Sequence, residues 1–224
     1  MSISAFTKQA PIKVDIWSDV ACPWCFIGKR KFEAAADAFD GQVVVEYHSF
    51  ELAPDTPEDY PGTHADYLVS RGFPADQIEA MDARVSGIAA SVGLAYDYER
   101  NHPTRTLKAH ELLHFAKAHG KQVEMKERLM QAYFERGEHV GRIDDLVGFA
   151  VEVGLDGAAA RAALESGEYA EDVQADIAQA RAYGINGVPF FVIDGRYGVS
   201  GAQETATLLE VLNNVKTENA VSAD

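Results

Sequence analysis

Cysteine is scarce in this chain: Cys22 and Cys25 are the only two among 224 residues. Positive charge is also in deficit, because 20 Lys and Arg face 35 Asp and Glu and leave a formal net charge of −15. That balance disfavours nucleic acids and anionic membranes as partners. We interpret the acidic surface as a source of solubility.

Long hydrophobic segments are missing too. No stretch approaches the ~18 consecutive apolar residues that a membrane-spanning helix needs, and Met1–Lys13 lacks the apolar core of a signal peptide. The sequence also has no internal repeat and no Gly-rich phosphate-binding loop. These absences predict a cytoplasmic protein, and in that compartment a lone pair of cysteines is more often catalytic than structural.

The two cysteines form the tetrad Cys22-Pro23-Trp24-Cys25 between two predicted elements. A short apolar strand, Val14–Trp17, precedes the tetrad, and a helical run, Phe26–Phe39, follows it. At such a junction the unpaired N–H groups and the dipole of the helix favour a thiolate over a thiol. The pattern predicts a thioredoxin-like redox site.

Each residue of the tetrad has an expected role in thiol–disulfide exchange. Cys22, at the N-cap, is expected to be the exposed nucleophile with a lowered pKa. Pro23 suits the first helical position because it has no N–H to leave unsatisfied, and Trp24 supplies a flat wall beside the sulfur. Cys25, in the first turn, is expected to resolve the mixed disulfide.

Two other interpretations of the cysteine pair are weaker. A structural zinc site normally needs four protein ligands, and the sequence has no second C-x-x-C. A structural disulfide that closes so short a loop would stabilise the fold little. We therefore expect no metal here.

The order of predicted elements points to a divided sheet. Strands are expected over 12–17, 43–47, 189–193 and 197–200, and helices over 23–39, 75–92, 104–118, 122–136, 144–153, 157–164, 168–183 and 203–215. The first strand, helix and strand form a βαβ unit, so those two strands are expected to be parallel. This order predicts an α/β protein with a thioredoxin-like fold split by an all-helical inserted domain.

The expected domain boundaries follow from this order. Residues 1–60 and 168–218 are expected to form the thioredoxin-like domain, and residues 63–167 the inserted helical domain. Residues 219–224 are expected to be a loose C-terminal tail, and Ser2–Ala10 is expected to be loose as well.

A second segment, Gly187-Val188-Pro189, opens the third predicted strand. In a thioredoxin-like fold this loop lies against the C-x-x-C, so we predict a cis peptide bond between Val188 and Pro189. Its backbone can pair with an extended substrate. Pro23, Trp24, Val188 and Pro189 are therefore the expected substrate-binding residues. The alternative is an ordinary trans proline at the start of a strand.

The stretch His110-Glu111-Leu112-Leu113-His114 matches the H-E-x-x-H pattern of zinc proteases. No third ligand lies at a familiar spacing, and Glu135 is the nearest candidate. We interpret these histidines as solvated or packing residues, with zinc hydrolysis as the less favoured alternative.

Three segments resemble one known family. Asp15–Lys29, which contains the tetrad, is similar to the active-site segment of the FrnE-like branch of the DsbA family. Gly184–Phe191 resembles the cis-proline loop of that family, and Gly201–Gln203 resembles the start of its last helix. The resemblance covers Lys13–Val215. It implies a thioredoxin fold with an inserted helical domain, and dithiol–disulfide oxidoreductase or isomerase activity.

A sibling branch shares this architecture: the 2-hydroxychromene-2-carboxylate isomerases and kappa-class glutathione transferases. Those enzymes generally carry Ser in place of the cysteine pair and bind glutathione, so Cys22 and Cys25 favour the redox branch. We expect an enzyme that acts on protein or small-molecule disulfides, without a cofactor beyond its own redox-active disulfide. Glutathione is a candidate co-substrate. The alternatives are a glutathione-dependent isomerase or transferase for a small aromatic, and a non-catalytic binding module. The sequence sets no oligomeric state.

Overall fold

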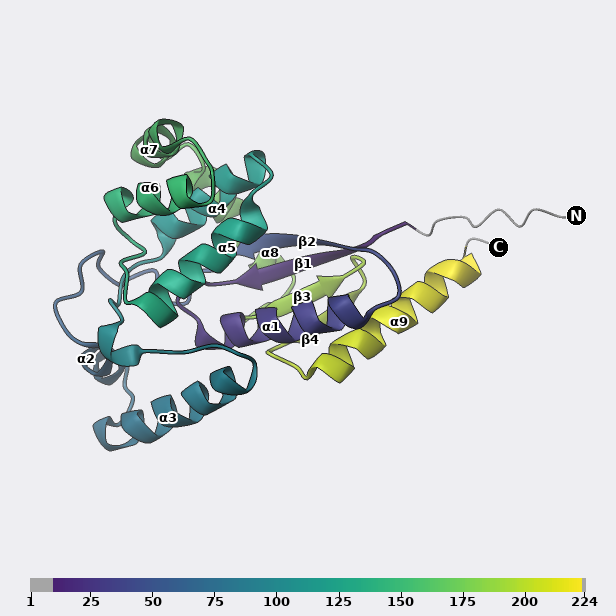
Figure 1. The fold of residues 1–224 in the computed structure, drawn as a ribbon, viewed down its shortest axis with the longest axis horizontal. Coiled ribbons are helices and arrows are strands. Elements are labelled where there is room, and N and C mark those ends of the chain that lie inside the picture. The colour runs from purple at the N-terminus through teal and green to yellow at the C-terminus, as the bar shows by residue number, and fades with distance from the viewer. Residues whose placement is uncertain (1–9, 223–224) are drawn as a thin grey trace, which may run out of the picture.

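A four-stranded sheet lies at the centre of the computed structural model, which describes residues 10–222 (Figure 1). The strands are β1 (Ile12–Ser18), β2 (Val43–Ser49), β3 (Phe190–Ile193) and β4 (Tyr197–Ser200), in the order β2-β1-β3-β4. β1 and β2 are parallel, whereas β3 is antiparallel to β1 and β4. The predicted parallel βαβ unit is confirmed, and the last two predicted strands form the β3–β4 hairpin.

The helices surround this sheet in the predicted order. They are α1 (Pro23–Ala38), α2 (His64–Ser70), α3 (Ala75–Ser91), η1 (Tyr98–Arg100), α4 (Leu107–Ala118), α5 (Gln122–Gln131), the π-helical η2 (Ala132–Arg136), α6 (Ile143–Glu152), α7 (Gly157–Ser166), α8 (Ala170–Ala182) and α9 (Thr205–Ser222). The segment from α2 to α7 is the predicted helical insertion. Helix α2 is not among the predicted helices, although the reciprocal capping box of Thr63 and Asp66 marks its start.

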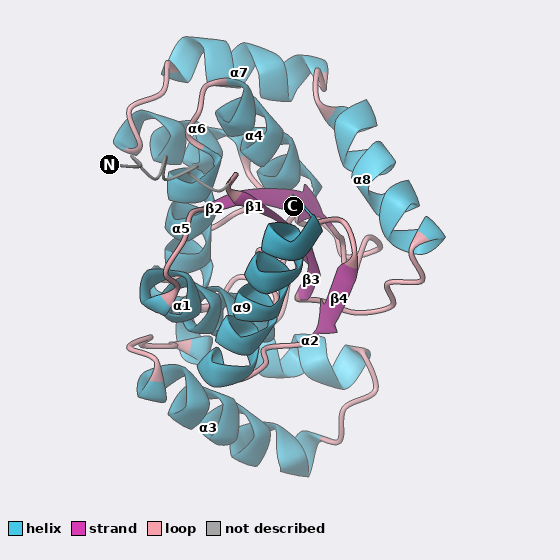
Figure 2. Cartoon of the chain, turned by 90° about the vertical axis from the view of Figure 1, so that its right-hand side faces the viewer, coloured by secondary structure: helices cyan, strands magenta, loops and turns pink. Residues whose placement is uncertain are grey.

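One face of the sheet is covered by α1 and α9, which lie side by side (Figures 1 and 2). Alternate residues of β1 point toward these helices, as the two-residue period of a strand requires. Ile12, Val14 and Ile16 are buried there against Phe32 of α1 and Leu212 of α9. Each such side chain contributes roughly 1.5–3 kcal/mol on burial.

The opposite face is covered by α8, which also packs on α4 (Figure 2). Trp17 of β1 packs there against Ala180 and Ile185. Its indole N–H donates to the carbonyl of Asp176 in α8, at 3.0 Å. Its ring stacks on the imidazole of His48 with centroids 4.4 Å apart. The sheet is therefore a buried middle layer.

The insertion is anchored to the outer edge of β2 through one amide side chain. The Tyr47 N–H donates to Oε1 of Gln122 in α5 at 3.0 Å, and Nε2 of Gln122 donates to the Tyr47 carbonyl at 2.8 Å. β2 is an edge strand, so these backbone groups have no strand partner on that side. Gln122 satisfies both of them and fixes α5 against the sheet.

The end of α9 differs from the expectation. The predicted loose tail over 219–224 is wrong for residues 219–222, because α9 continues to Ser222. Asn219 contacts Arg196 and Asp194 of the β3–β4 hairpin, which stabilises this last turn. Residues 1–9 and 223–224, and with them most of the predicted loose N-terminus, lie outside the described residues.

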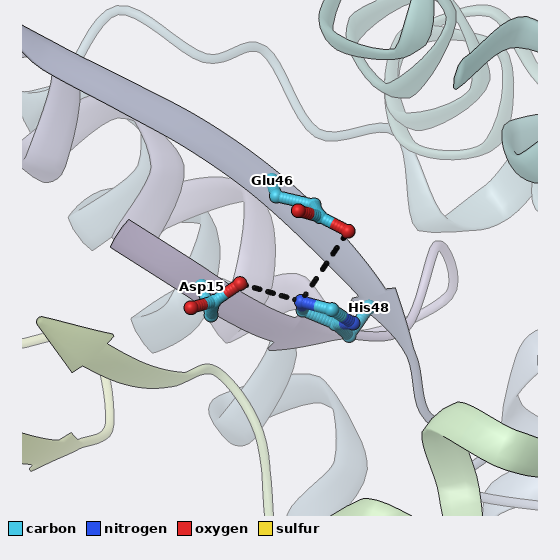
Figure 3. A group of neighbouring side chains, drawn as sticks. All are labelled: Asp15, Glu46 and His48. Carbon is cyan, nitrogen blue, oxygen red and sulfur yellow. Dashed lines mark hydrogen bonds and ion pairs between the residues drawn. The ribbon is translucent and has the colours of Figure 1, made fainter. Parts of the chain in front are cut away.

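An ionic network joins β1 to β2 (Figure 3) and continues to Asp176 of α8. Nε2 of His48 lies 2.8 Å from Asp15, and its Nδ1 lies 2.8 Å from Asp176. Asp176 also accepts a hydrogen bond from the Ser49 N–H at 2.7 Å. Burial opposes protonation of His48, but the hydrogen bonds that the protonated ring donates to Asp176 and Asp15 outweigh it and raise the pKa of His48 above its ordinary value.

We expect His48→Gln to lower the free energy of unfolding by roughly 1.5–3 kcal/mol at pH 5.5, because Asp15 and Asp176 each lose a charged hydrogen-bond partner. The folded-state pKa of His48 is raised, so its contribution is complete below its ordinary pKa of about 6.5 and is lost as pH rises through the folded value. The deficit of the variant should therefore shrink toward pH 8.5. Urea unfolding across this range measures it.

His119→Gln is the matched control, because the His119 ring bonds only the Phe115 carbonyl among the hydrogen bonds of residues 10–222. Its deficit should be small and should vary little with pH. A deficit of His48→Gln that stays constant from pH 5.5 to 8.5 would contradict the assigned ionic role.

Candidate active site

The cysteine pair lies where the turn after β1 leads into α1. Cys22 is the N-cap of α1, Pro23 opens the helix, and the Cys25 N–H donates to the Cys22 carbonyl at 3.0 Å. Both cysteines are free thiols. The expected exposure of Cys22 is wrong: it is only 3 % exposed, against 2 % for Cys25 and 40 % for Trp24. Cys22, the predicted nucleophile, is therefore buried two residues before an exposed indole.

The loop before β3 accounts for this burial. The Val188–Pro189 peptide bond is cis, as predicted. The Cys22 thiol donates to the Val188 carbonyl at 3.5 Å, so residues from the two ends of the chain meet here. Pro189 packs against α1 at Gly28, where an added Cβ would lie 2.9 Å from the Pro189 ring. The substrate-binding roles of Pro23, Trp24, Val188 and Pro189 stay predictions.

A buried contact between a carboxylate and an imidazole supports the turn that carries Cys22. Asp19 is 2 % exposed, and its Oδ1 lies 3.3 Å from Nε2 of His110 in α4. Its other oxygen accepts from the Leu52 N–H at 2.8 Å. Burial opposes ionisation of Asp19, but its hydrogen bond with His110 outweighs it and lowers the Asp19 pKa. The turn is thus fixed from both the sheet side and the insertion.

The two thiols influence each other's ionisation. The neighbouring Cys25, followed by burial, raises the pKa of Cys22. Burial also opposes a Cys25 thiolate, but the neighbouring Cys22 and the charge of Lys126 outweigh it and lower the Cys25 pKa. The predicted low pKa of Cys22 is therefore not met in this reduced geometry. The physical reason is that Cys25 and burial both disfavour a negative charge on the Cys22 sulfur, which makes no capping hydrogen bond to α1.

Lys126 of α5 is a buried charged residue that is not among the predicted site residues. It is 0 % exposed, and burial lowers its pKa to about 8. The available signal was a lysine within a run of core positions, since Met125, Leu129 and Met130 of the same helix are all fully buried. Periodicity places such a residue on the apolar face of the helix, but it does not show which side chains of other elements pack against it.

The H-E-x-x-H residues serve three separate partners. His110 faces Asp19, whereas Nε2 of His114 lies 3.1 Å from Asp176. Glu111 accepts from Lys108 at 2.8 Å. In residues 10–222 these side chains do not form a group with metal-ligand geometry. The interpretation as packing residues fits this arrangement.

Another set of side chains has ligand atoms close enough to hold a metal: Asp15, Glu46 and His48, all within 4.8 Å of one another (Figure 3). Their polar atoms already have partners. Lys13 lies 2.9 Å from Asp15 and 3.0 Å from Glu46. A cation there would have to displace this lysine, so we interpret the group as part of the ionic network.

An apolar cavity opens beside the tetrad. It has a volume of about 500 Å³ and lies between the active-site turn, α2 and α3. Its wall includes Pro23 and Trp24 on one side and Leu68, Phe73 and Val85 on the other. A bound molecule with an apolar group would therefore lie next to the start of α1.

Comparison with known proteins assigns this architecture. Residues 13–213 match the family described as DSBA-like thioredoxin domain. The chain belongs to this family. It is also 36 % identical over 187 residues to the uncharacterized protein YwbO of Bacillus subtilis, a match that covers 81 % of this chain and 86 % of YwbO. The predicted DsbA-family membership and thioredoxin-like fold are confirmed.

Solved structures agree with this assignment. The probable DsbA oxidoreductase SCO1869 from Streptomyces coelicolor superposes with a TM-score of 0.87 at 37 % identity, covering 92 % of this chain and 91 % of that one. The cytosolic disulfide reductase DsbM from Pseudomonas aeruginosa shares the fold, with a TM-score of 0.62 at 19 % identity over 93 % of this chain and 99 % of DsbM. The protein is a thioredoxin-fold oxidoreductase of the DsbA family.

Among the helices of residues 10–222, none is both long enough and apolar enough to span a membrane.

We expect Gly28→Ala to lower the free energy of unfolding by about 1–3 kcal/mol, because the new methyl group would overlap the Pro189 ring and force the loop or α1 to move. Gly87→Ala is the control, since this helical glycine of α3 has open space at its Cβ position. It should gain about 0.5–1 kcal/mol. Urea unfolding compares the two, and equal gains for both would contradict the close packing of Pro189 on α1.

Proposed function

We propose that this protein is a dithiol–disulfide oxidoreductase or isomerase of the FrnE-like type, which exchanges disulfides through Cys22 and Cys25. The observation that carries the proposal is the placement of two free thiols at the start of α1, with the Val188 carbonyl 3.5 Å from the Cys22 sulfur. Thiolate chemistry at a helix N-terminus is the expected use of such a pair.

The exchange needs a thiolate at Cys22. When Cys22 passes its proton to Cys25, the Cys22 thiolate attacks one sulfur of the substrate disulfide and releases the other as a thiolate. Cys25 then passes its proton to this released thiolate and attacks the Cys22 sulfur, which breaks the mixed disulfide and expels the second substrate thiolate. Two electrons leave the cysteine pair, the substrate disulfide is reduced, and a Cys22–Cys25 disulfide remains. The reverse sequence oxidises a substrate dithiol.

The surroundings of Cys22 suit substrates with an apolar part. The cavity of about 500 Å³ adjoins Pro23 and Trp24, and the Val188 backbone is placed beside the sulfur. We propose protein or small-molecule disulfides as substrates and a reducing compartment such as the cytoplasm as the location. DsbM, which shares the fold, has been solved with GSH, which supports glutathione as a co-substrate here.

A second candidate function is a glutathione-dependent isomerase or transferase for a small aromatic. The apolar cavity favours it, and the fold is shared with a 2-hydroxychromene-2-carboxylate isomerase at 14 % identity. Two cysteines at the site are not needed for that reaction, so we rank it below disulfide exchange.

We expect the wild-type protein to reduce insulin disulfides with glutathione or dithiothreitol as the electron donor. Cys22→Ala should lose this activity entirely, because it removes the attacking sulfur. Cys25→Ala should accumulate a mixed disulfide through Cys22, because the resolving thiol is absent. Turbidity and mass spectrometry measure the two effects.

The controls separate the candidate functions. Ser166→Ala, a substitution at the end of α7 in the insertion, should retain full activity. Wild-type protein that conjugates or isomerises an aromatic electrophile with glutathione, and still does so as Cys25→Ala, would favour the second candidate. A Cys22→Ala variant that keeps both activities would overturn both candidate functions.

A further inference from the structure

The apolar cavity beside the cysteine tetrad is enclosed by segments of the insertion that are fixed to one another. Nε2 of His64, at the start of α2, lies 3.4 Å from Oδ1 of Asp82 in α3. The His64 ring also stacks on the Tyr98 ring of η1, with centroids 4.6 Å apart. These contacts hold α2, α3 and η1 together, so the cavity is preformed. Its volume of about 500 Å³ falls in the range of ~300–1,000 Å³ that small-molecule sites have.

One wall of this cavity is the π-helical turn η2. Tyr133 and Phe134 follow each other in this turn, and both line the cavity. Short π-helical turns are rare and frequently occur at functional sites. The Phe134 ring stacks on the Tyr96 ring at a centroid distance of 4.6 Å, and Tyr133 meets Phe134 edge-on at 4.9 Å. The wall therefore holds one phenol hydroxyl in a defined place.

The Tyr133 hydroxyl is the unusual group of this wall. Tyr133 is only 5 % exposed, and within residues 10–222 its hydroxyl makes no hydrogen bond. Most buried polar side-chain atoms have a partner, so an unpaired one requires an explanation. This hydroxyl is not sealed inside the protein as Nζ of Lys126 is, so its open side is the cavity that the ring lines. A bound molecule with a hydrogen-bond acceptor would supply the missing partner.

The remaining lining selects an uncharged molecule. Asp82 and Arg84 of the lining carry a formal charge, but Asp82 already contacts His64 and Arg84 is exposed. An ionised group that enters apolar surroundings without a partner is strongly disfavoured. The net charge of −15 on the protein acts against anions in addition. The carboxylates of glutathione disulfide therefore do not suit this cavity, whereas an uncharged aromatic or aliphatic group does.

The cavity also reaches the residues on both sides of the predicted nucleophile. Ala21 and Pro23 line it, and Cys22 lies between them in the turn. Trp24 lines it as well and is partly exposed, so the cavity opens next to the tetrad. A disulfide with its apolar half in the cavity would therefore present its sulfur atoms close to Cys22.

We propose that this cavity binds the apolar half of a small, uncharged disulfide that carries a carbonyl group, and that Tyr133 sets this specificity by donating a hydrogen bond to the carbonyl oxygen. This inference rests on the proposed disulfide exchange and names the substrate class of the same site. It makes Tyr133, a residue of the insertion, part of the substrate-binding surface.

The exchange with such a disulfide, RSSR, is balanced. The Cys22 thiolate forms a bond to the sulfur of the half that lies in the cavity, the S–S bond of RSSR breaks, and the other half leaves as a thiolate. This thiolate takes the proton of Cys25, and the Cys25 sulfur then displaces the bound half from Cys22. In total the dithiol gives two electrons and two protons, and two RSH molecules leave. Two molecules of glutathione restore the dithiol and become glutathione disulfide.

The binding test uses bis(4-acetamidophenyl) disulfide, which has an aromatic ring and an amide carbonyl in each half, and diphenyl disulfide, which lacks the carbonyl. Both are titrated against a variant that combines Cys22→Ala and Cys25→Ala, so that no exchange can occur. Quenching of Trp24 fluorescence measures binding, because Trp24 lines the cavity. Addition of Tyr133→Phe, which removes only the hydroxyl, should weaken binding of the acetamido compound by about two- to tenfold, the usual effect of one hydrogen bond. Binding of diphenyl disulfide should stay unchanged.

The turnover test keeps both cysteines and uses glutathione as the electron donor. Tyr133→Phe should lower kcat/KM for the acetamido disulfide by a similar factor and leave insulin reduction unchanged. Leu68→Trp is a second variant, which should fill the cavity and abolish binding of both aromatic disulfides, because Leu68 lines the cavity from α2. Circular dichroism and urea unfolding establish that each variant is folded, and a variant that folds decides without the other.

Tyr169→Phe is the matched control. It makes the same chemical change at the N-cap of α8, where Tyr169 packs on Phe115 and does not line this cavity. It should alter neither binding nor turnover of the acetamido disulfide.

The outcomes separate this inference from the proposed function. Wild-type protein without insulin reductase activity would overturn the proposed function. If that activity is present, failure of the cysteine-free variant to bind the acetamido disulfide, or equal binding of it by folded Tyr133→Phe, would overturn the assignment of the cavity alone. Two further results would also overturn it: competition by glutathione disulfide at equal concentration, and an equal loss of insulin reduction in Tyr133→Phe, which would assign the cavity to a side chain of a protein substrate.

Discussion

The docking of α5 between β2 and α1 is the constraint on which the active site depends. Gln122 replaces a missing neighbouring strand for Tyr47, and Glu127 joins the first two turns of α1 through Lys29 and Arg30. Because these contacts hold α5 on both β2 and α1, the insertion cannot shift along the sheet without breaking them.

Buried charge is the recurrent theme around the cysteines. Asp19 and His110 form a pair beneath the turn, and they belong to different parts of the chain. Such pairs cost desolvation energy and are stable only when their remaining hydrogen bonds are made. The Leu52 and Ala21 N–H groups supply these bonds to Asp19. The polar groups that hold the turn therefore also contribute to the electrostatic potential at the two thiols.

The site is assembled from segments that are distant in sequence. Cys22 and Val188 meet because β1 and β3 are antiparallel neighbours in the sheet, so that β1 ends where β3 begins. The cysteine tetrad, the proline loop, the βαβ unit and the helical insertion could be predicted, since each has a local signal. The burial of Cys22 could not, because it depends on where the Val188 loop comes to lie.

By itself the sequence determined the chemistry that is available: one pair of thiols at a strand–helix junction, and a proline that opens a strand. Only the tertiary structure decided the electrostatics of that pair. The cost of burying a charge depends on every group packed around it, and those groups come from α4, α5 and the loop before β3. His110 therefore matched a zinc pattern in the sequence but supports Asp19 in the fold, and the complete burial of Lys126 became visible only once α5 was packed into the core.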